Sequence, residues 1–197
     1  TRTDSSAASD VYKRQDGDFS RRAMIHRMNG DLANDLGNLS QRVLSMISKN
    51  CSGVMPALPA TAAPEDSALL DAADAMLGKV RAHMDLQSFH EALRCIWEVV
   101  SDANKYVDTT APWGLKKTDP VRMGEVLAVL AETIRQAAIL VQPVMPGSAS
   151  KILDQLGVAD DQRGFDMLAG AGRIAAGVEI SKPEPVFPRF VEEEGEV

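Results

Sequence analysis

Apolar residues in this chain recur every three or four positions along several long stretches, and this spacing restricts the fold more than any other feature. Residues 31–44 show it best, and the apolar stripe there consists of Leu32, Leu36, Leu39 and Val43. Such a stripe is typical of an amphipathic helix. The pattern extends from a cap at Ser20 to about Asn50, which predicts one long first helix. No segment shows strongly the alternation typical of strands, so the sequence predicts an all-α protein.

Further helices are predicted at about 64–84, 85–107, 119–141 and 148–157. Their limits follow from helix breakers, since prolines exclude helix from the loop at 51–61 and Pro143 and Pro146 end the helix before them. Gly157 is placed to cap the last helix. Amphipathic helices with short connections are typical of antiparallel bundles, and we therefore expect residues 16–157 to form one antiparallel helical bundle.

The two ends of the chain lack this periodicity. Residues 1–15 are polar and rich in Ser and Ala, which predicts disorder. Residues 158–197 are predicted to form an irregular tail that packs back on the bundle and ends in frayed acidic residues. Within it, 182–189 must be extended, because each Pro restricts the residue before it. Gly30 and Gly37, seven residues apart in the first helix, indicate a close approach by a neighbouring helix or a ligand.

Composition excludes several classes of protein. A net charge of -7 argues against binding nucleic acid through a broad basic surface, but not against a small local site. No apolar run reaches the roughly 20 residues that span a bilayer, and the first residues carry no secretory signal pattern. We therefore expect a cytoplasmic protein without membrane contact. Cys51 and Cys95 stand alone, without a paired His or a C-x-x-C spacing, so no metal site or disulfide is predicted.

A catalytic role finds no support in the motifs. The chain has no glycine-rich phosphate loop, no H-E-x-x-H pattern and no nucleophile elbow. Its histidines, His26, His83 and His90, fall on different predicted helices and are interpreted as surface or hydrogen-bonded residues. No catalytic residue and no cofactor are predicted for this chain.

One row of polar residues accompanies the apolar stripe of the first helix. Asn34, Asn38 and Arg42 follow at intervals of four residues, which places them beside one another on a helix. Amide and guanidinium groups present donors and acceptors in a fixed plane and can read the edges of unpaired bases. The alternative is that the row is an ordinary solvated helix flank.

Trp113 is the second candidate for a binding role. It follows Pro112 at a helix break, where no apolar stripe includes it, and an indole held there could stack on a base. The alternative is a tryptophan that covers the end of the bundle. Nearby cations are candidates for contacts with an RNA backbone, namely Lys105, Lys116 and Lys117. Trp97, in contrast, belongs to an apolar stripe and is predicted to be core.

Four segments together resemble the anticodon-binding domain of bacterial methionyl-tRNA synthetases, which are class I aminoacyl-tRNA synthetases. They are residues 15–20, 31–42, 104–113 and 183–189. The second segment has the D-L-x-N-x-x-x-N pattern that related class I synthetases share, and the third has a Pro-Trp element that they lack. The resemblance extends from Gln15 to Arg189, and residues before Gln15 are interpreted as a non-native extension.

The resemblance implies an α-helical domain that binds the CAU anticodon of the tRNA(Met) stem-loop during methionyl-tRNA formation. Asn38 and Arg42 would hydrogen-bond anticodon bases, and Trp113 would stack under the first of them. The family's catalytic domain, with H-I-G-H and K-M-S-K-S signatures, would precede this region, and the chain contains neither signature. The chain thus resembles a fragment that acts with that domain in cis, where ATP and Mg²⁺ would bind. No room remains after Arg189 for a dimerising module, so we expect a monomer.

Two alternatives remain open. One is a helical protein-interaction module without RNA binding, which the negative charge and the Met-rich stripes favour. The other is the anticodon domain of a different class I synthetase, such as the leucine, isoleucine, valine or cysteine enzyme.

Overall fold

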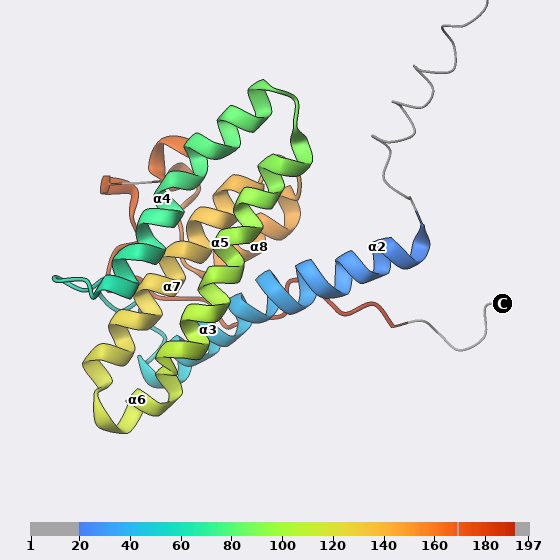
Figure 1. The fold of residues 1–197 in the computed structure, drawn as a ribbon. Coiled ribbons are helices and arrows are strands. Elements are labelled where there is room, and N and C mark those ends of the chain that lie inside the picture. The colour runs from blue at the N-terminus through green and yellow to red at the C-terminus, as the bar shows by residue number, and fades with distance from the viewer. Residues whose placement is uncertain (1–19, 169, 192–197) are drawn as a thin grey trace, which may run out of the picture.

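The structure, a computed structural model, describes residues 20–168 and 170–191 (Figure 1). Its helices are α2 (Arg21–Arg27), the π-helix η1 (Met28–Gly37), α3 (Asn38–Asn50), α4 (Pro64–Asp85), α5 (Phe89–Thr110), α6 (Pro112–Thr118), α7 (Pro120–Val141) and α8 (Pro146–Gln155). Three short 3₁₀ turns follow, at Asp160–Gln162, Phe165–Met167 and Gly170–Gly172. Over these residues the only β pairing is one isolated bridge, so the prediction of an all-α fold is confirmed. The predictions for residues 1–15 and for the last acidic residues lie outside the described part.

Helix α7 is the centre of the bundle. Every residue from 126 to 141 is buried, because α3, α4, α5 and α8 all pack against this helix (Figure 1). Helices α4 and α5 form an antiparallel hairpin that turns at residues 86–88. The apolar residues predicted to face inward on the helix at 119–141 are all buried. Its opposite faces are buried as well, since the helix lies inside the bundle and not on its surface.

Buried charges on α7 attach the tail to the bundle. Glu132 and Arg135 form an ion pair at 2.7 Å, and both side chains are almost fully buried. The Glu132 carboxylate also accepts the backbone N–H of Ile174 at 2.9 Å. Arg135 donates to the backbone oxygens of Met167 and Leu168. The pair is thus satisfied by backbone groups of the tail, as a buried charge requires.

The first helix differs from the prediction of one regular α-helix. Residues Met28–Gly37 form a π-helix, in which backbone hydrogen bonds reach the fifth residue along the chain. The wider turns shift the phase of the side chains, so residues before this segment no longer share the stripe formed by Leu36, Leu39 and Val43. No residue of α2 is buried, and Met24 and Met28 are exposed. The apolar pattern predicted from Ser20 onwards therefore does not mark a buried face in α2.

The tail returns to this first helix and explains one of its two glycines. A Cβ on Gly37 would lie 3.2 Å from the Phe187 ring and 2.8 Å from the Leu32 backbone oxygen. The close approach predicted at Gly37 therefore comes from the tail, whereas a Cβ on Gly30 would have no neighbour within 4 Å. Beyond Phe187, the Asn29 side-chain amide both donates to and accepts from the Phe190 backbone.

Two predicted proline breaks differ in detail. The sequence predicts an irregular chain after residue 107, but α5 continues to Thr110 and a further short helix, α6, follows at once. Pro146 begins α8 instead of only ending the helix before it, because a helix needs no backbone N–H at its first position. Gly157 has a φ of 73°, which confirms its predicted place as the cap after α8.

Candidate nucleic-acid interface

Arg42 and Trp113 meet where α3 passes the short helix α6. The Cζ atom of Arg42 lies 5.5 Å from the centre of the Trp113 ring, within the range of a cation–π contact. The same guanidinium donates to the Asp108 carboxylate, at 3.0 Å. Arg42 and Trp113, which the sequence singled out separately, therefore belong to one surface. Asp108, on α5, holds the Arg42 guanidinium close to the Trp113 ring.

The junction between α5 and α6 directs the Trp113 side chain. Ala111 takes the left-handed conformation, with φ 41°, which a residue with a side chain rarely adopts. The buried Pro112 follows as the first residue of α6 and fixes the next backbone step. Trp113 then lies in the first turn of α6, with 52% of its surface exposed. The alternative that it folds back to cover the bundle end is therefore wrong.

Asn38 lies one helical turn before Arg42. It is the first residue of α3 and is exposed, and the spacing of four residues places both side chains on the same face. Asn34 does not join them, because it belongs to the π-helix and its side-chain oxygen accepts a hydrogen bond from Arg189. Of the predicted polar row, Asn38 and the half-buried Arg42 share one face of α3, and Asn34 ties the first helix to the tail.

Three lysines surround this surface in different ways. Lys116 and Lys117 are exposed in the last turn of α6, three and four residues after Trp113 in the chain. Lys105, on α5, is also exposed but pairs with Asp102 at 3.0 Å. Arg42 and Lys105 are already paired with Asp108 and Asp102, so the positive charge that this corner adds comes from Lys116 and Lys117, in a protein of net charge -7. A local basic site on an acidic chain can bind phosphate groups without a broad basic surface.

A buried cluster of Asp66, Tyr106 and Arg122 joins the helices next to this surface. The Asp66 carboxylate accepts hydrogen bonds from Tyr106 at 2.6 Å and from both terminal nitrogens of Arg122 at 2.5 and 2.7 Å. Burial raises the pKa of Asp66, but the hydrogen bonds of Arg122, Tyr106 and the Ala63 backbone outweigh it and hold the pKa below its ordinary value. Burial and then the Asp66 carboxylate raise the pKa of Tyr106 well above its ordinary value. The cluster joins α4, the last turns of α5 and the start of α7.

Four residues of this region were not predicted from the sequence, namely Asp66, Tyr106, Asp108 and Arg122. An acidic residue in the first turn of a helix, such as Asp66, is favoured by the helix dipole whether it is buried or exposed. Its partners are distant in the chain, and a single sequence carries no signal for the pairing. Asp108 lies on the exposed side of α5 and its relevance follows only from its distance to Arg42.

The other candidate residues lie apart from this surface. The indole nitrogen of the half-buried Trp97 donates to the backbone oxygen of Asp31 at 3.0 Å, so Trp97 joins α5 to the π-helix at the edge of the core. His26, His83 and His90 lie on α2, α4 and α5. In the described ranges no three His, Cys, Asp or Glu side chains group as metal ligands, and no helix is long and apolar enough to cross a membrane. The surface formed by Asn38, Arg42 and Trp113 therefore offers an amide, a guanidinium and an aromatic ring. These groups can hydrogen-bond and stack with unpaired bases.

The sequence matches a known family over most of its length. The profile described as the anticodon binding domain of methionyl tRNA ligase matches residues 55–197. The methionine–tRNA ligase of Brucella suis is 52% identical over 179 residues, which cover 90% of this chain and 34% of the relative. That of Mycobacterium tuberculosis is 48% identical over 181 residues, with 89% and 34% covered.

Solved structures are similar as well. The free form of Mycobacterium tuberculosis methionyl-tRNA synthetase superposes with a TM-score of 0.85 at 45% identity, over 89% of this chain and 36% of that one. The same protein in complex with methionyl-adenylate gives a TM-score of 0.83 at 46% identity, over 87% and 34%. This chain therefore spans about a third of the length of the relatives it matches.

Proposed function

The chain belongs to the family of anticodon-binding domains of methionyl-tRNA ligases, and from this premise we propose that it recognises the CAU anticodon of tRNA(Met) for methionyl-tRNA formation. This chain covers 34% of the Brucella suis relative, and the formation of methionyl-tRNA would take place in the part of the ligase that lies outside this chain. Because the chain belongs to this family, we no longer retain the two alternatives, a protein-interaction module and the anticodon domain of another class I synthetase.

The contact between Arg42 and Trp113 is the observation that carries the proposal. Trp113 offers a half-exposed ring on which the first anticodon base would stack. Arg42 and Asn38 lie on one face of α3 and would hydrogen-bond the edges of anticodon bases. Asp108 keeps the Arg42 guanidinium at the ring, so that less side-chain freedom is lost when RNA binds.

Further parts of the proposal concern the RNA backbone and the rest of the ligase. Lys105, Lys116 and Lys117 would contact phosphates of the anticodon stem-loop. ATP and Mg²⁺ would bind in the catalytic domain, which would act in cis with this chain, and no residue of this chain is assigned to them. We further propose that the ligase works as a monomer in the cytoplasm.

Binding to short RNAs tests the proposal directly. The chain is titrated with an anticodon stem-loop that carries CAU and with one that differs only in the anticodon, and affinities are measured at one fixed salt concentration. We expect tighter binding of the CAU stem-loop. Trp113→Ala should weaken it by about 1 to 3 kcal/mol, roughly 5- to 150-fold. Trp113→Phe is the matched control, because it retains a ring and should lose less. Equal affinity for both RNAs would contradict the proposal.

A further inference from the structure

The chain on both sides of α6, the helix that carries Trp113, is held by a single carboxylate. Figure 1 shows α6 at one end of the bundle, between the end of α5 and the start of α7. Asp66 accepts one hydrogen bond from Tyr106, near the end of α5, and two from Arg122, in the first turn of α7. Tyr106 and Arg122 thus lie on either side of α6 in the chain and meet at the same buried side chain.

On the α5 side, a series of hydrogen bonds leads from Tyr106 towards Trp113. The Thr110 hydroxyl donates to the Tyr106 backbone oxygen at 2.7 Å, and the Ala111 N–H donates to the Val107 backbone oxygen at 3.1 Å. Ala111 has a φ of 41°, a conformation that persists only where the surrounding structure imposes it. Trp113 follows two residues later. The direction of the Trp113 ring therefore depends on where the last turns of α5 are held.

On the α7 side, the end of α6 is fixed to the turn that supplies Arg122. The Asp119 side chain accepts the Arg122 backbone N–H at 2.9 Å, and the Asp119 N–H donates to the Leu115 backbone oxygen at 2.8 Å. Leu115 is partly buried and packs against the core. A rotation of α6 would have to break or shift hydrogen bonds at one of its two ends.

Stability alone does not explain a polar cluster at this place. A buried ion pair often contributes no more to stability than apolar residues of the same volume would. Its hydrogen bonds are directional, however, and those that Asp66 accepts from Tyr106 and Arg122 measure 2.5 to 2.7 Å. A binding side chain that must keep one orientation needs neighbours that are fixed in this way.

We propose that Tyr106, with Asp66 and Arg122, is a positioning residue for anticodon recognition, because the buried cluster holds the Trp113 ring in the direction in which a base stacks on it. This inference rests on the proposed function, in which Trp113 stacks under the first anticodon base. Asp66 and Tyr106 are buried, so they act on the RNA only through α6. The affinity for RNA should therefore depend on a hydroxyl group that the RNA does not contact.

Tyr106→Phe is the direct test, since it removes the hydroxyl and keeps the ring. Asp66 remains bonded to Arg122 and to the Ala63 N–H, so no buried group loses all its partners. We expect the affinity for the CAU stem-loop to fall roughly 3- to 10-fold, the usual cost of ordering one side chain on binding. In a Trp113→Ala background the same change should have an effect below about twofold, because no ring is left to position. An equal fall in both backgrounds would overturn the inference.

Thr133→Val is the matched control. Thr133 is buried in α7, about three helical turns beyond Arg122, and its hydroxyl donates to the Val129 backbone oxygen at 2.9 Å. The variant removes a buried hydroxyl away from α6 and should change the affinity by less than about twofold. An equal loss of affinity in Thr133→Val and Tyr106→Phe would also overturn the inference, since any lost buried hydrogen bond would then have the same effect.

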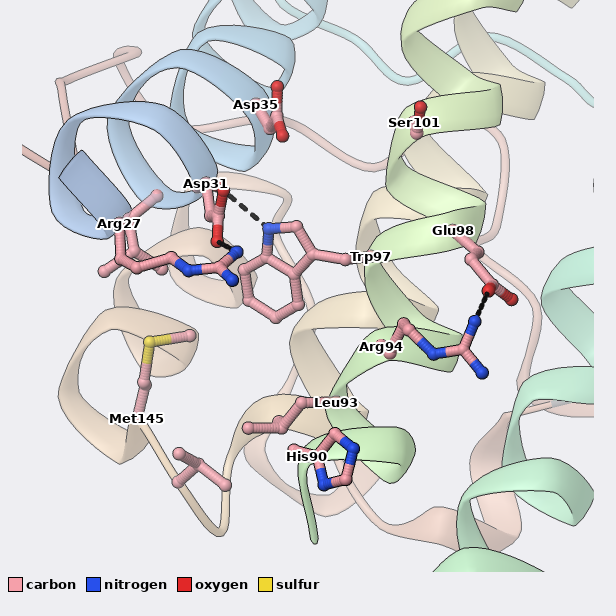
Figure 2. Close-up of a pocket in the computed structure, with 12 residues that line it drawn as sticks. Arg27, Asp31, Asp35, His90, Leu93, Arg94, Trp97, Glu98, Ser101 and Met145 are labelled. Carbon is pink, nitrogen blue, oxygen red and sulfur yellow. Dashed lines mark hydrogen bonds and ion pairs between the residues drawn. The ribbon is translucent and has the colours of Figure 1, made fainter. Parts of the chain in front are cut away.

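The two tryptophans allow a test of the cluster without RNA. Both are labelled with 5-fluorotryptophan for fluorine NMR, and Trp113→Ala identifies the Trp113 signal. Trp97 lines a pocket beside the π-helix, where its indole nitrogen donates to the Asp31 backbone oxygen, and its signal is the internal reference (Figure 2). We expect Tyr106→Phe to shift or broaden the Trp113 signal and to leave the Trp97 signal in place. An unchanged Trp113 signal would overturn the inference.

The two measurements separate this inference from the proposed function. A Trp113 signal that moves without any loss of affinity for the CAU stem-loop would overturn the inference. Equal affinity of the wild type for both stem-loops, with a Trp113 signal that moves, would contradict the proposed function and still support the role of the cluster in placing the ring. If Tyr106→Phe does not fold, Arg122→Lys provides the same test from the other end of α6, because lysine keeps the charge beside Asp66 but not the paired hydrogen bonds.

Discussion

Arg122 donates to both oxygens of the Asp66 carboxylate, with nitrogen–oxygen distances of 2.5 and 2.7 Å. Paired parallel hydrogen bonds of this kind are the strongest that an arginine and a carboxylate form. Asp66 is completely buried, and Tyr106 supplies a third side-chain donor. The cluster ties the first turn of α4 to the first turn of α7 and to Tyr106, which lies near the end of α5, shortly before the junction that leads to Trp113.

Asp66→Asn should destabilise the chain strongly. The substitution removes the carboxylate nearest to the Arg122 guanidinium and leaves only Glu65 and Glu125, both at 3.4 Å, and breaking a buried pair costs about 3 to 5 kcal/mol. Urea unfolding followed by circular dichroism measures the change in the free energy of unfolding. Asp161→Asn is the control, since Asp161 is exposed and should change stability by less than about 0.5 kcal/mol. A loss below about 1 kcal/mol for Asp66→Asn would show that the pair contributes little.

The same carboxylate should make stability depend on acid. Its pKa in the folded chain is below the ordinary value, so the folded state favours the ionised form. The stabilisation is complete above the unfolded pKa, near 3.9, and is lost as pH falls through the lower folded pKa. We expect the free energy of unfolding to decrease below about pH 4 in the wild type and to decrease less in Asp66→Asn. Parallel pH profiles of the two proteins would contradict this assignment.

The sequence predicted features that depend on local spacing. Of the predicted stripe, Leu36, Leu39 and Val43 are buried as expected, because helical periodicity places them on one face, whereas Leu32 is only half-buried. For Trp113, outside any stripe, the sequence left two interpretations open, and its 52% exposure was found only in the structure. In contrast, no local spacing indicated the π-helix, whose Asn29 and Asn34 are hydrogen-bonded to the tail, or helix α6, which follows an alanine in a left-handed conformation.

Partners distant in the chain account for most of what the sequence did not predict. Glu132 reads as an exposed residue of an amphipathic helix, yet it is buried because α7 lies at the centre and Ile174 returns to it. Likewise, nothing in the sequence near Arg42 indicates Asp108. The contact of Arg42 with Trp113 could be anticipated only through the family resemblance, since spacing alone placed Arg42 in the first helix and Trp113 at a helix break.

The two glycines of the π-helix should respond differently to alanine. At Gly37 the added Cβ would lie 2.8 Å from a backbone oxygen and 3.2 Å from the Phe187 ring, so Gly37→Ala should cost about 1 to 3 kcal/mol. At Gly30 no atom lies within 4 Å, and Gly30→Ala should be neutral or stabilise by up to about 1 kcal/mol. Thermal unfolding compares the pair, and equal melting temperatures would argue against the close packing of Phe187 on Gly37.

Arg42→Lys should separate RNA recognition from stability. Lysine keeps the charge but cannot present the planar pair of donors, so affinity for the CAU stem-loop should fall by about 1 to 3 kcal/mol. Stability should change by less than about 1 kcal/mol, because the pair with Asp108 is largely exposed. Fluorescence anisotropy gives the affinity and urea unfolding gives the stability. Full retention of the preference for CAU in the lysine variant would show that the guanidinium does not read a base.

Lys116 and Lys117 should affect RNA binding in a manner that differs from Trp113. Each phosphate contact releases counterions, so replacing one contacting lysine by alanine should reduce the slope of log affinity against log salt by about 0.7 for single-stranded RNA. The loss should be the same for CAU and altered anticodons, because phosphates carry no sequence information. Trp113→Ala, in contrast, should lower affinity with little change in slope. Binding titrations at several salt concentrations distinguish the two effects. A double variant of Lys116 and Lys117 with the wild-type slope would place the RNA backbone elsewhere on this surface.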